Sequence, residues 1–185
     1  SIRYGTVDIG YKFEFDNGHI TPITGFNWYN ERLEADGLQC NPNDLGLACT
    51  NVSGGTRVFF NDASYYSWRL GVNTTWEATK RLSLTADAAF LPVVYLDNED
   101  SHYLRGDLGP TPNIFHDGYG VGGMLDVFVD YKLTDRWSAG AGFRYWRFDI
   151  DDGDATFGST SSSTFPLREF TSQRYGVMLQ SEYRF

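Results

Sequence analysis

Hydrophobic and polar residues alternate along most of the chain, and the pattern is clearest at its end. Residues 174–185 place Tyr175, Val177, Leu179, Tyr183 and Phe185 on one face, with Gly176, Gln180, Glu182 and Arg184 on the other. This is the period of a β-strand, whose successive side chains point to opposite sides. Aromatic residues at both ends of an apolar face, repeated down a chain, are typical of a barrel wall that faces lipid.

Seven such segments can be marked, at about 2–15, 20–35, 64–79, 82–96, 118–132, 137–150 and the closing strand. Each exceeds the roughly 5–6 residues of an ordinary strand and reaches the roughly 9–11 residues that cross a bilayer. Each also carries ionisable or amide side chains on its second face, as a polar lumen allows. The sequence therefore predicts an all-β fold: a single domain over residues 1–185 forming a transmembrane antiparallel up-and-down β-barrel.

The connections between these segments are of two kinds. Those at 16–19, 79–82 and 133–136 are short, whereas those at about 36–63, 97–117 and 151–165 are long and contain many loop-forming residues. Outer-membrane barrels have short periplasmic turns and longer external loops. We therefore expect a bacterial outer-membrane protein whose long loops are extracellular and whose C-terminus is periplasmic.

An odd number of strands is unusual, because single-chain bacterial barrels close with an even count. We expect an odd number of further strands upstream, so that the complete barrel has an even count; a total of about ten is what the family resemblance described below implies. The residues from Ser1 to Gly5 already have the pattern of a strand and carry no secretory signal. A competing interpretation places an additional strand around Arg57 to Phe60, but this would break the up-and-down order.

Composition narrows the class of protein. No apolar run of 18 residues exists, which excludes a membrane helix, and the mean hydropathy of -0.39 fits a barrel that turns only alternate residues to lipid. The net charge is -9, from 24 acidic and 15 basic residues, which argues against nucleic acid as a partner. The acids of the long loops serve solubility or, alternatively, attract cationic substrates.

Two features bear on disulfides and metals. Cys40 and Cys49 lie in one loop-like segment, and a local disulfide formed in an oxidising compartment is the favoured interpretation. A structural zinc site is less favoured because it needs four ligands. The acidic run from Asp149 to Asp154 lacks the spacing and the closing glutamate of an EF-hand, so a solvated acidic turn is expected there. We expect neither a metal nor a cofactor.

The acidic segment 97–107 contains Asp100-Ser101-His102 at the top of the fourth strand. In residue type, spacing and place this resembles the Asp-x-His pair of the omptins, ten-stranded outer-membrane proteases. Segments 3–11 and 140–146 resemble omptin-like barrels of Gram-negative bacteria. The resemblance implies endopeptidase action at basic residues, with His102 as general base and Asp100 fixing its tautomer. A solvated loop histidine is the alternative. The omptins' second acidic pair has no match in this chain.

Other charged residues are weaker candidates. Asp97, Glu99 and Asp107 either bind a basic substrate side chain or keep the rim soluble, and solubility is favoured for each. His19 and His116 fall in predicted turns with no acid at a useful spacing. Basic residues near the rims, Arg32, Arg57 and Lys80, are candidates to meet lipid phosphates, as omptins do with lipopolysaccharide.

The expected partners are outer-membrane lipids including lipopolysaccharide, a peptide or protein substrate, and the barrel-assembly machinery that recognises a terminal aromatic strand. The rival class is a non-enzymatic barrel, either a narrow channel or a structural and adhesive surface protein. Charged residues line the predicted lumen, namely Arg69, Arg144, Asp87, Asp126, Glu77 and Glu182. Their ion pairs are expected to plug a lumen of this size, which weakens the channel interpretation.

Overall fold

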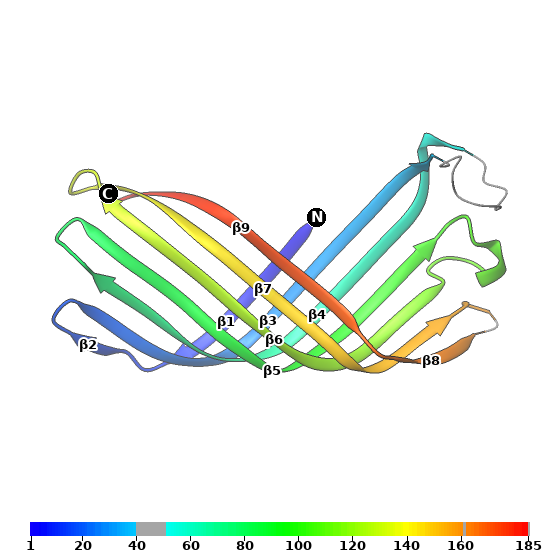
Figure 1. Ribbon diagram of the computed structural model, residues 1–185, viewed down its shortest axis with the longest axis horizontal. Helices are drawn as coiled ribbons and strands as arrows, with labels where there is room; N and C mark the ends of the chain where they lie inside the picture. Colours follow the sequence, from blue (N-terminus) through cyan, green and yellow to red (C-terminus); the bar gives the residue numbers. More distant parts are fainter. Residues whose placement is uncertain (40–50, 161, 185) are drawn as a thin grey trace.

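A computed structural model describes residues 1–39, 51–160 and 162–184, which form one antiparallel sheet that curls as a half-barrel (Figure 1). Its strands are β1 (Ile2–Gly10), β2 (Phe13–Phe15), β3 (Gly18–Leu38), β4 (Val52–Glu77), β5 (Leu82–His102), β6 (Ile114–Lys132), β7 (Trp137–Phe157), β8 (Ser163–Leu167) and β9 (Phe170–Tyr183). Within these ranges the one helix is the short 3-10 turn η1 (Gly106–Leu108). No helix there is long and apolar enough to cross a membrane.

The order of the strands confirms the predicted up-and-down architecture. β1 and β2 together form the first long strand, both pairing with β3, and β8 and β9 form the last, both pairing with β7. Between them β3, β4, β5, β6 and β7 each pair with the next strand along the chain. The short connections gather at one end of the sheet and the longer ones at the other (Figure 1).

The strands are longer than the alternation predicted. β3 extends to Leu38, β5 to His102 and β7 to Phe157, so much of the sequence predicted as long loops is paired strand. These outer arms have polar residues on both faces, which is why hydrophobic alternation did not reveal them. Residues 57–60 continue β4, so the interpretation of a separate strand there is wrong. The acidic run 149–154 lies within β7, so the predicted turn is wrong as well.

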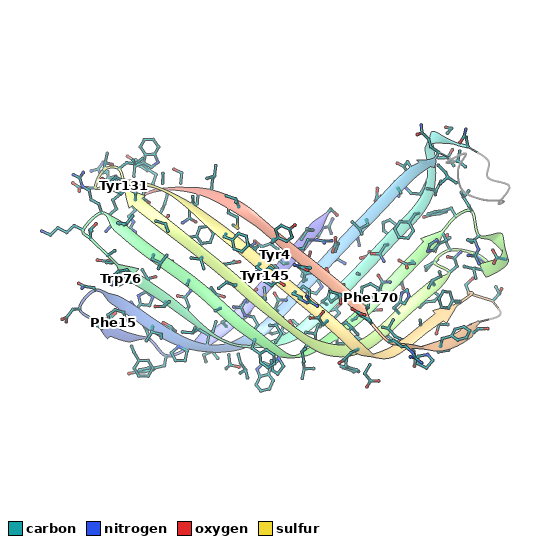
Figure 2. All side chains as sticks on the ribbon, in the orientation of Figure 1. Tyr4, Phe15, Trp76, Tyr131, Tyr145 and Phe170 are labelled. Atoms are coloured by element: carbon teal, nitrogen blue, oxygen red, sulfur yellow. The ribbon has the colours of Figure 1, made fainter. Side chains whose placement is uncertain are left out.

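The outer face of the sheet is apolar. Val7 and Ile9 at one edge are each 75% exposed, and Leu179 at the other edge is 84% exposed. Figure 2 shows the aromatic side chains of Phe15, Trp76 and Tyr131 at the end of the sheet that carries the short turns.

A second row of aromatic residues crosses β3 to β6 nearer the opposite end, on the same outer face. Neighbouring rings of Phe26, Tyr66, Tyr95 and Tyr119 lie 6.4, 6.3 and 5.0 Å apart between centroids. The outer face therefore carries an apolar band with aromatic residues at both margins.

The inner face is layered along the strands. Ion pairs occupy the middle of the sheet: Arg69 Nη2 lies 2.7 Å from Asp87 Oδ1, and Arg144 Nε lies 2.8 Å from Asp126 Oδ1. This confirms the ion pairing predicted for these lumen residues. At the same level the hydroxyl oxygen of Tyr4 in β1 accepts a hydrogen bond from Arg144 Nη1 over 2.9 Å.

The core sits on the inner face next to these ion pairs, toward the long connections. It contains Tyr29, Ala63, Tyr65, Ala89, Leu91, Val94, Leu96, Met124, Trp146, Phe148 and Ile150. The Tyr65 and Phe148 rings stack with centroids 4.8 Å apart. Burying each large side chain contributes about 1.5–3 kcal/mol, so this layer stabilises the curled sheet.

Cys40 and Cys49 lie outside the described residues, as does Phe185, so the disulfide stays a prediction.

Candidate functional site

The direction in which Asp100 and His102 point is set by a β-bulge at Pro92 in β5. At this point β5 advances by three residues while each neighbouring strand advances by two. On the β4 side, Phe90 pairs with Leu70 and Val93 with Trp68. On the β6 side, Leu91 pairs with Gly122 and Val94 with Gly120. One extra residue reverses the alternation of side chains. Even-numbered residues face outward before the bulge and inward after it, where Val94 and Leu96 are fully buried.

Proline suits this position because it has no N–H to contribute to the ladder. Beyond the bulge, Asp100 and His102 lie on the inner face of the sheet, two residues apart. Without the bulge, both side chains would continue the outward row. The local sequence thus places a carboxylate and an imidazole above the buried core.

Asp100 belongs to a network of amides and a second histidine. Asn61 of β4 donates from Nδ2 to Asp100 Oδ1 and to Asn98 Oδ1, the latter over 2.5 Å. Asn98 Nδ2 lies 2.9 Å from Nδ1 of His116, which stands opposite it on β6. The second oxygen of Asp100, Oδ2, is 4.0 Å from the same His116 nitrogen. Four residues from three strands therefore meet on the inner face.

His116 is held in its neutral form. Because Asn98 Oδ1 already accepts from Asn61, the Asn98 amide is the donor to His116 Nδ1, and the remaining proton of a neutral ring sits on Nε2. Burial lowers the pKa of His116, Asp100 opposes this, and the nearby His102 lowers the pKa further. A neutral imidazole at pH 7 presents one N–H donor to whatever enters beside it.

His102 is fixed by its backbone rather than by its ring. Its N–H donates to Asn113 Oδ1 over 3.0 Å, and Asn113 Nδ2 donates back to the His102 carbonyl over 3.2 Å. Asn113 is fully buried and also donates its backbone N–H to the Asp100 carbonyl over 2.9 Å. The His102 ring packs edge-on against Phe59, with centroids 5.1 Å apart. The ring nitrogens of His102 are thus left for other chemistry.

The structure changes the relation between the predicted residues. Asp100 and His102 share a face, but the imidazole within ion-pair reach of Asp100 is that of His116. His116 was expected to lie in a turn without an acid; it lies in β6, and strand pairing brings the acid to it. The contact between Asp100 and His116 depends on the register of the hairpin formed by β5 and β6, which the spacing of residues in the sequence does not reveal.

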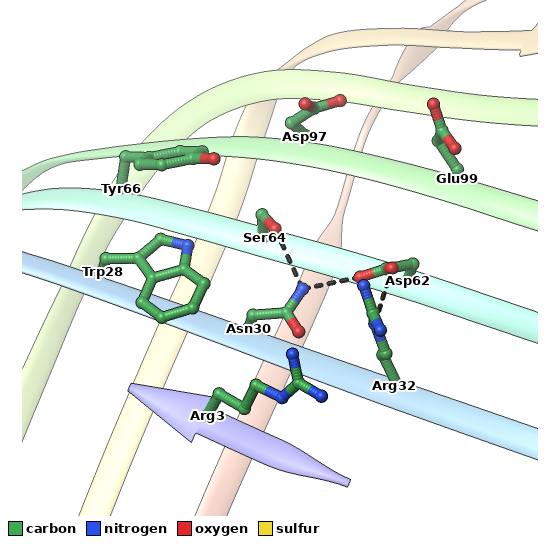
Figure 3. Close-up of a pocket in the computed structure, with 9 residues that line it drawn as sticks. All are labelled: Arg3, Trp28, Asn30, Arg32, Asp62, Ser64, Tyr66, Asp97 and Glu99. Atoms are coloured by element: carbon green, nitrogen blue, oxygen red, sulfur yellow. Dashed lines mark hydrogen bonds and ion pairs between the residues drawn. The ribbon is translucent and has the colours of Figure 1, made fainter. Parts of the chain in front are cut away.

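The three acidic candidates for substrate binding lie elsewhere. Asp97 and Glu99 are on the outer face, opposite to Asp100, in a groove that also contains Arg3 and Arg32 (Figure 3). Asp107, in η1, forms an exposed ion pair with Arg105 at 2.7 Å; its hydrogen bond to Arg105 lowers the pKa of that carboxyl.

A cavity of about 140 Å³ opens on the inner face beside the Asp100 network. Its walls are Glu31, Leu33, Asn61, Ala63, Tyr65, Phe170, Thr171, Ser172 and Arg174. Two of these residues connect it to the network: Asn61 donates to Asp100, and the Phe170 ring lies 5.5 Å from the His116 ring. A group bound in this cavity would contact Asn61 and Phe170, the neighbours of Asp100 and His116. Sequence patterns gave no sign of it, because β9 is far from β3 and β4 in the chain.

Over residues 1–39, 51–160 and 162–184, no three His, Cys, Asp or Glu side chains gather closely enough to hold a metal ion.

Comparison with solved structures identifies a similar fold. The chain is similar to the outer membrane protease OmpT from Escherichia coli, with a TM-score of 0.73 and 12% sequence identity. The match covers 100% of this chain and 64% of that one, so the chain spans less than two thirds of its length. No model of a known protein family and no curated protein matches the sequence. The likeness is one of fold: this chain is an antiparallel up-and-down sheet that curls like part of a β-barrel wall.

Proposed function

We propose that this chain is part of the wall of an outer-membrane barrel of a Gram-negative bacterium and that the site around Asp100, on the inner face, hydrolyses peptide bonds. The apolar outer band and its aromatic margins support the membrane location. The short turns then lie in the periplasm, and the hairpins that carry Asp100, His102 and His116 stand outside the cell. β1 and β9 each have a single strand neighbour among the described residues, and further strands are proposed to close the wall between them.

One observation carries the enzymatic part of the proposal. A carboxylate and two imidazoles, Asp100, His102 and His116, share the inner face next to a buried apolar core, in a fold similar to that of a protease. Buried amides hold Asp100 and His116, and the core below them keeps the cavity separate from the inner end of the lumen. Polar groups held in fixed positions by buried amides are what the stabilisation of a developing charge requires.

Each group has a role in the proposed reaction. His102 takes a proton from a water molecule, whose oxygen attacks the scissile carbonyl, and returns that proton to the leaving amine. The negative charge of Asp100 stabilises the His102 imidazolium formed between these steps. The Nε2–H of neutral His116 donates to the carbonyl oxygen as it gains negative charge. The resemblance also implies a second acidic pair, which in this proposal comes from the strands that close the wall.

The test is cleavage of internally quenched peptides by the purified protein in detergent. His102→Ala is expected to lower kcat/KM by about 10²–10⁴-fold, the usual contribution of a general base. The control is His19→Ala, since His19 lies at the start of β3, at the end of the sheet with the short turns. Migration of unheated protein in SDS gels verifies that both variants are folded.

Equal cleavage by His102→Ala and the unaltered protein would sink the assigned role of His102. Absence of cleavage by the unaltered protein, with a folded barrel, would instead favour the structural or adhesive interpretation. A channel would appear as ion conductance that survives His102→Ala; the ion pairs of Arg69 and Arg144 and the core above them oppose this.

Lipid contacts form the last part of the proposal. Arg3 and Arg32 stand on the outer face just beyond the aromatic row that includes Tyr66, at the level where lipid head groups begin (Figure 3). They are proposed to contact the phosphates of outer-membrane lipids, including lipopolysaccharide. Lipopolysaccharide that copurifies with the protein should decrease in the Arg3→Gln, Arg32→Gln double variant; unchanged retention would argue against this contact.

A further inference from the structure

The cavity beside Asp100 contains an acid that is already neutralised. Glu31 of β3 is the one acidic residue in its walls, and its side chain is 6% exposed. Arg174 of β9 forms an ion pair with Glu31 Oε1, and Ser172 donates to Glu31 Oε2 over 3.4 Å. The Arg174 guanidinium also donates to the Gln173 carbonyl over 2.8 Å. Both oxygens of Glu31 therefore have partners supplied by the protein itself.

The rest of the cavity is largely apolar. Leu33, Ala63, Tyr65 and Phe170 contribute hydrocarbon surface, and Asn61 connects the cavity to Asp100. Cavities of about 150 Å³ hold a molecule as large as benzene, so about 140 Å³ admits a medium-sized side chain. A cationic side chain that entered here would be repelled by Arg174, and it would find Glu31 already paired. It would therefore lose its hydration without gaining a counter-charge.

We infer that this cavity is the side-chain subsite of the proposed peptidase and that Arg174 makes it select a neutral, apolar side chain. The inference rests on the proposed function and departs from the basic preference that the omptin resemblance implies. Arg174 occupies Glu31 as the side chain of a basic substrate would. Removing its charge exposes a buried carboxylate and converts the subsite to one for Lys or Arg.

The experiment compares cleavage of matched peptides that carry Leu or Arg at a single position. The unaltered protein is expected to favour Leu by about tenfold or more, and Arg174→Met to reverse the preference by about ten- to hundredfold, the worth of one charge-assisted hydrogen bond. The double variant Glu31→Gln, Arg174→Met should favour Leu again. Arg174→Lys keeps the charge and should keep the Leu preference. Arg184→Met is the matched control: Arg184 follows β9, is exposed and pairs with Glu182.

A binding measurement separates this inference from the proposed function. n-Butylguanidinium, which has the shape and charge of an arginine side chain, is titrated calorimetrically into each variant after its folding has been verified. Binding at least about tenfold tighter to Arg174→Met than to the unaltered protein and the double variant supports the subsite charge even if no peptide is cleaved. If only Arg174→Met fails to fold, the comparison of Arg174→Lys with the unaltered protein against both peptides decides. An Arg preference in the unaltered protein, or no gain of n-butylguanidinium binding in folded Arg174→Met, overturns the inference.

Discussion

At the scale of single residues, one buried amide fixes the tautomer of a histidine. Asn98 is 1% exposed, and its two polar atoms are both engaged, Oδ1 with Asn61 and Nδ2 with His116. Because an amide nitrogen can only donate, His116 Nδ1 must keep its lone pair. Protonation of His116 would therefore place two donors face to face, in addition to charging a buried ring.

This arrangement predicts how stability depends on pH. The pKa of His116 is lowered by burial in the folded protein, whereas in the unfolded chain it returns to about 6.5. As pH falls below about 6.5, the unfolded chain binds the proton first, so the free energy of unfolding decreases until the lower folded pKa is passed. His116→Gln should remove this component. Urea unfolding of the unaltered protein and of His116→Gln between pH 7.5 and 4.5 gives the free energy of unfolding at each pH. The unaltered protein should lose stability more steeply as the pH falls, and parallel curves for the two proteins would contradict the assignment to His116.

At the scale of elements, the bulge at Pro92 is the feature on which the site depends. It is the point where β5 passes from a wall strand to an arm whose inward residues are Val94, Leu96, Asn98 and Asp100. A bulge that inserts one residue turns every later side chain to the other face. The same strand can therefore present Phe90 outward to the apolar band and Asp100 inward to the cavity.

Deleting Pro92 should consequently destabilise the barrel. The deletion restores regular pairing, so either Leu96 leaves the core for the outer face or the outer arm loses its register. Loss of one buried leucine from a core costs about 2–5 kcal/mol. Pro92→Gly, which can retain the bulge, should lower the free energy of unfolding by less. Urea titrations of the two variants make the comparison, and equal stabilities would show that the bulge does not orient the arm.

The limits of prediction from sequence follow from the same elements. Alternation is local, so it located the wall strands and their inward charges, including Arg69 and Arg144. It stopped at the outer arms, where both faces are polar and the period of two disappears. Pro92 was the one local signal of a bulge within β5. Contact between Asp100 and His116 depends on the register of a hairpin, and the Glu31 cavity on strands distant in sequence, so neither could be predicted from spacing.

At the scale of the whole molecule, the inner and outer faces give the wall a direction. Along the strands the inner face passes from ion pairs through the apolar core to the cluster around Asp100. The outer face passes from an apolar band to a polar groove at Arg3 and Glu99 (Figure 3). On both faces the polar end is the one with the long hairpins, so the two ends of the sheet differ in chemistry as well as in the length of their connections (Figure 1).

Labelling of single cysteines on intact cells tests this orientation. Tyr103 follows β5 at the long-hairpin end, and Asp135 lies in the short turn between β6 and β7; both are exposed. In a background in which Cys40 and Cys49 are replaced by serine, a membrane-impermeant maleimide should label Tyr103→Cys at once. It should label Asp135→Cys only after the outer membrane is permeabilised, because in the proposed orientation the membrane separates the two ends of the sheet. The reverse order of labelling would invert the wall and place the Asp100 cavity in the periplasm. Labelling of both positions in a soluble fraction would remove the membrane from the proposal.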